Sequence, residues 1–154
     1  MASTQTSDVM DRALNGGVVP EVHVGAFGVY AEASIADWSA SDIYLMIPLP
    51  DRVQVLDGWI KTTGGQAGAG SGSFDVKVGT PDDDDKWITD TELLADTRVW
   101  FEGELGHVVT LTDSDTFPRM KPLIITVVSE TSGSAGGLMQ AFALLQNGPR
   151  SPGL

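Results

Sequence analysis

Short apolar segments recur along the chain, and glycine, proline and serine separate them. The strongest segment, at 42–50, reads Ile-Tyr-Leu-Met-Ile-Pro-Leu-Pro after Asp42. An apolar segment of this length is typical of a strand that is buried on both faces or that lies at a subunit contact. Pro48 cannot donate a hydrogen bond to a neighbouring strand, so we expect the strand to bend or to lie at a sheet edge there.

Other segments alternate between apolar and polar residues, as half-buried strands do. In 53–63, Val53 and Val55 point one way and Gln54 points the other way. Gly58 interrupts this alternation, which predicts a bulge or a close approach by another part of the chain. The remaining strands are expected at 74–78, 98–101, 108–112, 123–129 and 138–145.

Three segments between these strands predict other structure. The glycine-rich segment 64–73 is expected to be a flexible loop, 79–86 a charged turn, and 91–95 one helical turn. No segment offers the helical crossovers that a parallel sheet needs. About seven or eight strands with short turns therefore predict an all-β fold, an antiparallel β-sandwich or jelly roll.

One short helix is expected near the N-terminus. Ser7 suits its N-cap, and the acidic Asp8 and Asp11 suit its first turn. Gly16 and Gly17 supply the stop signal. A helix of two turns is marginal in water, so it must lie on a surface, either of its own domain or of a neighbour. Its apolar face carries Val9, Met10, Ala13 and Leu14.

We divide the chain into an N-terminal arm at 1–22, a β-domain at 23–146 and a C-terminal tail at 147–154. The extended segment 18–24 suits the arm to adding a strand to the sheet edge of a neighbour. We therefore expect apolar residues of the arm to contact a partner. They are Val9, Met10, Leu14, Val18, Val19 and Val22.

Composition and charge exclude several classes of site. The chain has 154 residues, enough for one domain with its own core, and no cysteine, which excludes disulfides, thiol nucleophiles and cysteine-bound metals. Nine Lys and Arg against 21 Asp and Glu give a net charge of −12, which repels nucleic acid and anionic membranes. No apolar segment reaches the roughly 18 residues of a membrane span. The N-terminal segment also lacks the pattern of a signal peptide, so we expect synthesis in a host cytoplasm.

Catalytic motifs are absent from the sequence. Neither Gly-x-Ser-x-Gly nor the Gly-Lys pair of a phosphate-binding loop occurs. His23 and His107 have no local partner motif and are expected to be structural or surface residues. Glu102 and Glu104 fit a solvated strand face better than a glycosidase pair. We expect no enzyme activity and no cofactor.

Four consecutive carboxylates, Asp82 to Asp85, form the sharpest charge feature of the chain. Calcium accepts such oxygen ligands, and Asp82 and Asp84 are the candidate residues. Lys86 stands where an EF-hand pattern needs its third acid. A solvated turn is therefore the favoured interpretation, and calcium binding is the alternative.

The tryptophans also allow two interpretations. Exposed rings can stack on sugars, whereas side chains of this size are usually buried in a core or an interface. We favour burial for these four residues, which are Trp38, Trp59, Trp87 and Trp100.

Three segments carry a resemblance to a known family. Residues 41–50 end in Pro-Leu-Pro, 53–60 contain Val-Leu-Asp, and in 74–88 an aspartate-rich turn follows Val-Gly. In this order they resemble small virion structural proteins of tailed bacteriophages, over about residues 23–145. The resemblance implies a β-sandwich building block without catalysis, often associated with the head as a decoration (cement) protein or a minor capsid component.

Taken together, the residues and the resemblance favour a decoration protein that binds the major capsid protein and stabilises the capsid lattice. We expect it in the virion, on the outer surface of the head, because packaged DNA repels an acidic protein. A homo-oligomer is expected, and a trimer is favoured because it fits a site on an icosahedral shell. Two alternatives stay open: a fibre, spike or tail component that contacts the host surface, and a carbohydrate-binding β-module.

Overall fold

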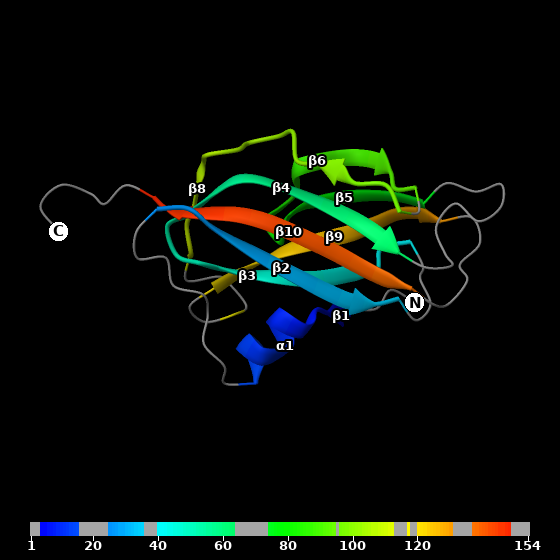
Figure 1. Cartoon of the computed structure of the whole chain (residues 1–154), viewed down its shortest axis with the longest axis horizontal. Helices are drawn as coiled ribbons and strands as arrows, with labels where there is room; N and C mark the ends of the chain where they lie inside the picture. Colours follow the sequence, from blue (N-terminus) through cyan, green and yellow to red (C-terminus); the bar gives the residue numbers. More distant parts are fainter. Residues whose placement is uncertain are drawn as a thin grey trace, which may run out of the picture.

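The computed structural model describes residues 4–15, 25–35, 40–63, 74–94, 96–112, 117, 120–130 and 137–148. Two sheets account for most of them (Figure 1). Sheet A has the order β1 (Thr4–Thr6), β3 (Ile43–Pro50), β9 (Met120–Glu130), β5 (Phe74–Thr80) and β6 (Asp83–Glu92). Sheet B has the order β2 (Phe27–Ser34), β10 (Leu138–Asn147), β4 (Val53–Thr63) and β7 (Val99–Trp100), and β8 (Val108–Val109) also pairs with β4.

Neighbouring strands are antiparallel except β1, which runs parallel to β3. The predicted all-β sandwich is therefore confirmed. The described residues form ten strands, more than expected from the sequence. The strands β7 and β8 lie within the expected segments 98–101 and 108–112, whereas β1, β2 and β6 were not predicted. A strand of three residues such as β1 carries too few alternating positions to be recognised from a sequence pattern.

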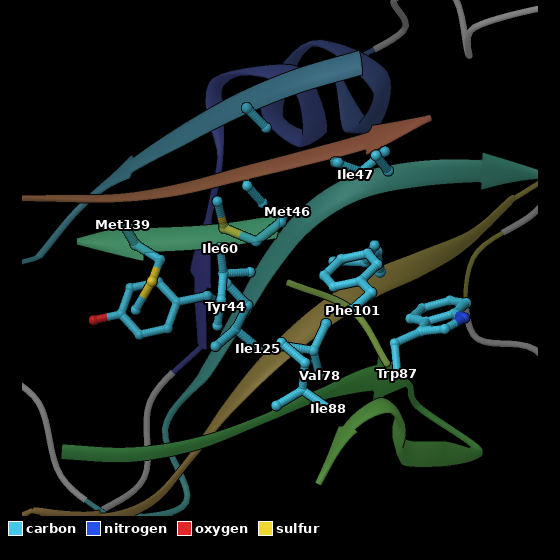
Figure 2. Packing of buried hydrophobic residues seen from close by; sticks show 14 of the residues in the cluster. Tyr44, Met46, Ile47, Ile60, Val78, Trp87, Ile88, Phe101, Ile125 and Met139 are labelled. Atoms are coloured by element: carbon cyan, nitrogen blue, oxygen red, sulfur yellow. The ribbon is translucent and has the colours of Figure 1, made fainter. Parts of the chain in front are cut away.

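The inner faces of the two sheets enclose the core. Figure 2 shows Tyr44 of β3 beside Ile60 of β4 and Ile125 of β9, all fully buried. Ile47 of β3 is fully buried in the same cluster. Leu45 points to the other side of β3, where it is also buried. The prediction that 42–50 forms a strand buried on both faces is confirmed.

Pro48 of β3 lies at a sheet edge. Pro48 pairs directly with Pro122 of β9, and neither residue has an N–H to donate. On its other side, β3 pairs with β1 only over residues 43–45. Among the described residues, β3 is thus an edge strand at Pro48, as its sequence predicts.

Gly58 of β4 marks a close approach, as predicted. A Cβ atom at this position would lie 2.4 Å from Cε2 of Phe101 and 2.5 Å from the carbonyl oxygen of Phe142. The ladder between β4 and β10 shifts its register nearby, where Asp57 and Val55 face consecutive residues of β10. Glycine is therefore required here so that Phe101 can enter the core.

Two local predictions are wrong. Only residues 81–82 form the turn expected over 79–86, because Asp83 to Lys86 already belong to β6. Residues 91–92 continue β6 instead of forming a helical turn, and their ladder to β5 holds them extended. The expected loop 64–73 lies outside the described residues.

The helix α1 (Asp8–Leu14) begins where the sequence predicts. Ser7 is its N-cap and accepts a hydrogen bond from the backbone N–H of Met10 at 3.0 Å. The Ser7 hydroxyl also donates to the carbonyl of Met46 in β3. The helix packs on β3 and β2, beside β1 (Figure 1). Its supporting surface is therefore its own domain, whereas the division into arm, domain and tail stays a prediction.

Candidate functional site

Lysines from neighbouring segments balance most of the aspartate run. Lys121 of β9 lies 3.2 Å from Asp82, Lys77 of β5 lies 2.7 Å from Asp84, and Lys86 lies 3.7 Å from Asp83. Lys86 also forms a 2.8 Å ion pair with Glu104. Ion pairs thus hold the run, and two of them, to Lys121 and Lys77, join it to neighbouring strands.

The pair between Lys121 and Asp82 differs from the others because its cation is buried. Only 5% of the Lys121 side chain is exposed, and its Nζ also donates to the carbonyl of Thr110 at 3.0 Å. Asp82 accepts a further hydrogen bond from the Thr80 hydroxyl at 2.7 Å. Desolvation raises the pKa of Asp82, but the hydrogen bonds from Thr80 and Lys121 outweigh it and hold that pKa below its ordinary value.

The calcium candidates Asp82 and Asp84 are therefore each paired with a lysine. A calcium ion would have to displace both ammonium groups to reach these oxygens. No group of three or more acidic, histidine or cysteine side chains suited to a metal exists within the described part of the chain. Calcium binding at Asp82 and Asp84 stays a prediction that the geometry does not favour.

The arm residues that were expected to contact a partner differ in burial. Met10 is fully buried against Leu45, Met120 and Ile124 on the outer face of sheet A. Val9 is partly buried against the main core, and Leu14 is 41% exposed. Of the described members, Leu14 is the one whose side chain is mainly open to a partner. The other members, Val18, Val19 and Val22, lie outside the described residues.

The tryptophans differ strongly in burial. Trp87 is 1% exposed and stacks on Phe101 at 5.9 Å between ring centroids (Figure 2). Trp59 is half-buried, and Trp100 is 50% exposed. Core burial is thus confirmed for Trp87, whereas Trp100 is exposed in the single chain and its burial at an interface stays a prediction. Trp38 lies outside the described residues.

Four aromatic side chains cross the outer face of sheet B in register. Phe142 of β10 faces Tyr30 of β2 on one side and Trp59 of β4 on the other, and Trp59 faces Trp100 of β7. We call these four residues the aromatic row. Strands are about 4.8 Å apart, so the row spans about 14 Å across the sheet. No local sequence pattern predicts this row, because its members are far apart in the chain and meet only through strand pairing.

The aromatic row is packed at its centre and exposed at its ends. The ring of Phe142 stacks on that of Trp59 at 5.9 Å and 21°, and the guanidinium carbon of Arg98 lies 4.5 Å from the centroid of Trp59. Gly28 makes room for Phe142, because a Cβ there would lie 2.6 Å from its Cε2. Tyr30 remains 43% exposed, as the end of the row opposite Trp100.

A pocket of about 430 Å³ lies between the neighbouring edges of the two sheets. The segment after β7 forms one wall, held to β6 by hydrogen bonds from the N–H groups of Glu102 and Gly103 to the carbonyl of Trp87, at 2.9 and 3.1 Å. Apolar and polar residues both line the pocket, and two of them are carboxylates. Its lining residues are Asp85, Trp87, Ile88, Thr89, Thr91, Val99, Trp100, Glu102 and Gly103.

His107 lies on the surface, consistent with its predicted role. Its side chain is 65% exposed, and Nδ1 is 4.0 Å from a carboxylate oxygen of Glu104. The hydrogen bond from Lys86 lowers the pKa of Glu104, as does the nearby charge of the same lysine. His23 lies outside the described residues. None of the described helices has the length and apolar character needed to cross a membrane.

The fold was compared with those of known proteins. No protein-family model and no curated protein matches the chain. A chain in the capsid structure of Ralstonia phage GP4 is similar in fold, with a TM-score of 0.72 at 12% identity over 96% of this chain and 99% of that chain. A chain in the capsid asymmetric unit of cyanophage Pam1 has a TM-score of 0.54 at 12% identity, over 83% of this chain and 91% of that one. The resemblance to phage virion structural proteins is confirmed at the level of the fold.

Proposed function

We propose that this chain is a non-enzymatic phage capsid protein that decorates the head, binding the major capsid protein and stabilising the capsid lattice. One observation carries the proposal: the fold matches a chain of a phage capsid over nearly the full length of both chains. The match thus extends over nearly the whole of that chain rather than over part of it.

Charge supports a place on the outer surface of the head. The net charge of −12 would oppose contact with packaged DNA, whereas an outer position keeps the two apart. The ion pairs of the aspartate run show how the fold tolerates this charge, because cations on neighbouring strands balance part of it. Synthesis in the host cytoplasm and assembly onto the head would follow.

The chain would stabilise the capsid lattice simply by binding to it. A protein that binds the assembled lattice but not its separated subunits stabilises the lattice by about 2.7 kcal/mol per site when its free concentration is 100 times Kd. A trimer would make three sets of contacts with the lattice at once, and its symmetry would match a threefold position on the shell. The exposed Leu14 of α1 is the arm residue that we propose for such contacts.

The direct test adds the purified protein to phage heads that assemble without it. We expect saturable binding by sedimentation, a higher temperature of DNA release, and density on the outer surface of the head by electron microscopy. The matched variants are Leu14→Asp, expected to weaken binding, and Leu94→Asp, an equally exposed leucine outside the arm.

Three results would overturn parts of this proposal. If heads cannot form at all without the chain, it is a shell-forming protein rather than a decoration. Density on the tail alone would favour the fibre, spike or tail alternative. Light scattering of the purified protein tests the oligomer, and a monomer both in solution and on the head would exclude the trimer.

A further inference from the structure

The aromatic row is an unpartnered apolar surface on an otherwise acidic protein. Tyr30 and Trp100 are among the few large apolar side chains that are exposed in the described residues. Trp, Tyr and Arg are enriched at the centres of protein interfaces and carry most of their binding energy. The row, with Arg98 stacked on Trp59, has this composition.

The row continues into the pocket between β6 and β7 through one residue. Trp100 is both the end of the aromatic row and part of the pocket lining. Asp85 and Glu102, both exposed, lie in the same lining, which includes no lysine or arginine. None of the ion pairs between described residues involves either carboxylate.

We propose that the aromatic row and this pocket form one docking face for a partner protein, which inserts an arginine or lysine side chain between Trp100, Asp85 and Glu102. The inference deepens the proposed function, because it rests on a partner in the capsid and names the chemistry by which that partner would be recognised. The acidic chain and a basic partner side chain supply the charge complementarity.

The chemistry of the pocket suits a cationic side chain. Carboxylates form short charge-assisted hydrogen bonds with guanidinium or ammonium groups, and a tryptophan face attracts a cation. Apolar residues of the lining such as Val99 and Trp100 suit the methylene stem of a long basic side chain. The volume of about 430 Å³ leaves space for one such side chain together with water.

Other occupants fit this surface less well. A sugar would find no open ring face at Trp59, because Phe142 and Arg98 already stack on it, and could use only the exposed rings at the ends of the row. A second copy of the chain would bring another net charge of −12 against the same face. A second copy remains an outcome that the test can detect.

The first test measures the pocket alone, without a capsid. The folded full-length protein is titrated by NMR with an acetylated tri-arginine amide and, separately, with the neutral tri-citrulline amide. We expect the arginine peptide to shift the Trp100 indole and the backbone signals of residues 85 and 102, and the citrulline peptide to shift them far less. Equal effects of the two peptides, or none, would overturn the inference.

A matched pair of double variants separates a specific site from general acidity. Asp85→Asn with Glu102→Gln removes the pocket carboxylates, whereas Asp90→Asn with Glu92→Gln makes the same charge change on exposed residues of β6 that do not line the pocket. We expect the first pair to weaken peptide binding roughly tenfold, as for loss of a charge-assisted hydrogen bond, and the second to leave it within about twofold. Equal weakening by both pairs would show non-specific attraction only.

The second test uses phage heads and distinguishes this inference from the proposed function. If the wild-type protein does not bind heads, the proposed function fails. If it binds and both double variants and Trp100→Ala bind equally well, the function stands and the docking face is wrong. We expect Trp100→Ala and the pocket pair to weaken head binding while their unfolding transitions stay close to that of the wild type. Self-association lost in these variants would instead assign the face to a second copy.

Discussion

Replacing Asp82 with asparagine tests the energetic account of the aspartate run. Asp82 is the partner of Lys121, whose side chain is 5% exposed, whereas the lysines that pair with Asp84 and Asp83 are 30% and 18% exposed. Asparagine keeps the size of the side chain but removes its charge. The substitution therefore removes the charge of Asp82 from a buried ammonium group that also donates to the Thr110 carbonyl.

The expected cost lies between two known limits. Removing one partner of a fully buried ion pair costs about 3–5 kcal/mol, and a surface pair is worth about 0–1 kcal/mol. The Asp82 side chain is 62% exposed, so water screens its charge even though its partner is buried. We expect a loss of about 1–2 kcal/mol in the free energy of unfolding, or about 2–8 °C in Tm for a chain of this length.

The stability difference between Asp82→Asn and the wild type should also depend on pH. Because the pKa of Asp82 is lowered in the folded state, its contribution to stability is present above its unfolded pKa and disappears as pH falls through the lowered folded pKa. Urea unfolding of the wild type and of Asp82→Asn should thus differ at neutral pH and converge in acid. Asp84→Asn is the control, with an expected loss below about 1 kcal/mol because its lysine is more exposed. Equal stability of Asp82→Asn and the wild type at pH 7, or a gap that persists unchanged in strong acid, would refute the reasoning.

Four other substitutions test the packing, each by urea unfolding. Gly58→Ala places a Cβ 2.5 Å from a backbone oxygen and should cost about 1–3 kcal/mol, whereas Gly28→Ala meets only a movable ring and should cost less. Tyr44→Phe should be neutral or slightly stabilising, because it removes a buried hydroxyl that has no hydrogen-bond partner. A loss above about 1 kcal/mol, roughly the value of one hydrogen bond, would show that the hydroxyl does have a partner. Ser7→Ala should cost about 1–2 kcal/mol through loss of the helix cap to Met10, and an unchanged midpoint would contradict the role of that cap.

Strand-by-strand features of the fold could be predicted because they depend on local pattern. The apolar segment 42–50 became β3, and Gly58 proved to be a close approach, since burial on two faces and a missing side chain both leave a mark in the sequence. The charged turn over 79–86 was wrong because its acidic residues are stabilised in β6 by lysines that the sequence places elsewhere. Local charge repulsion is evident in a sequence, but the distant cations that offset it are not.

The candidate docking face could not be predicted for a related reason. Members of the aromatic row come from four strands, and their common face depends on the register in which β10 pairs with β2 and β4. A shift of one residue in that register would move Phe142 to the inner face of the sheet. The pocket likewise requires the segment after β7 to fold back onto β6, which only the hydrogen bonds to Trp87 reveal.

The position of α1 determines how the arm can be tested. Met10 is buried with Leu45 and Ile124, and the segment before the helix adds the strand β1 to sheet A. Deleting residues 1–22 would therefore uncover apolar residues of sheet A and remove a strand, so any loss of capsid binding could follow from damage to the domain. A substitution at the exposed Leu14 leaves this packing in place. A change in head binding at Leu14 would therefore report the contact made by the arm itself, separately from the contribution of the arm to the fold.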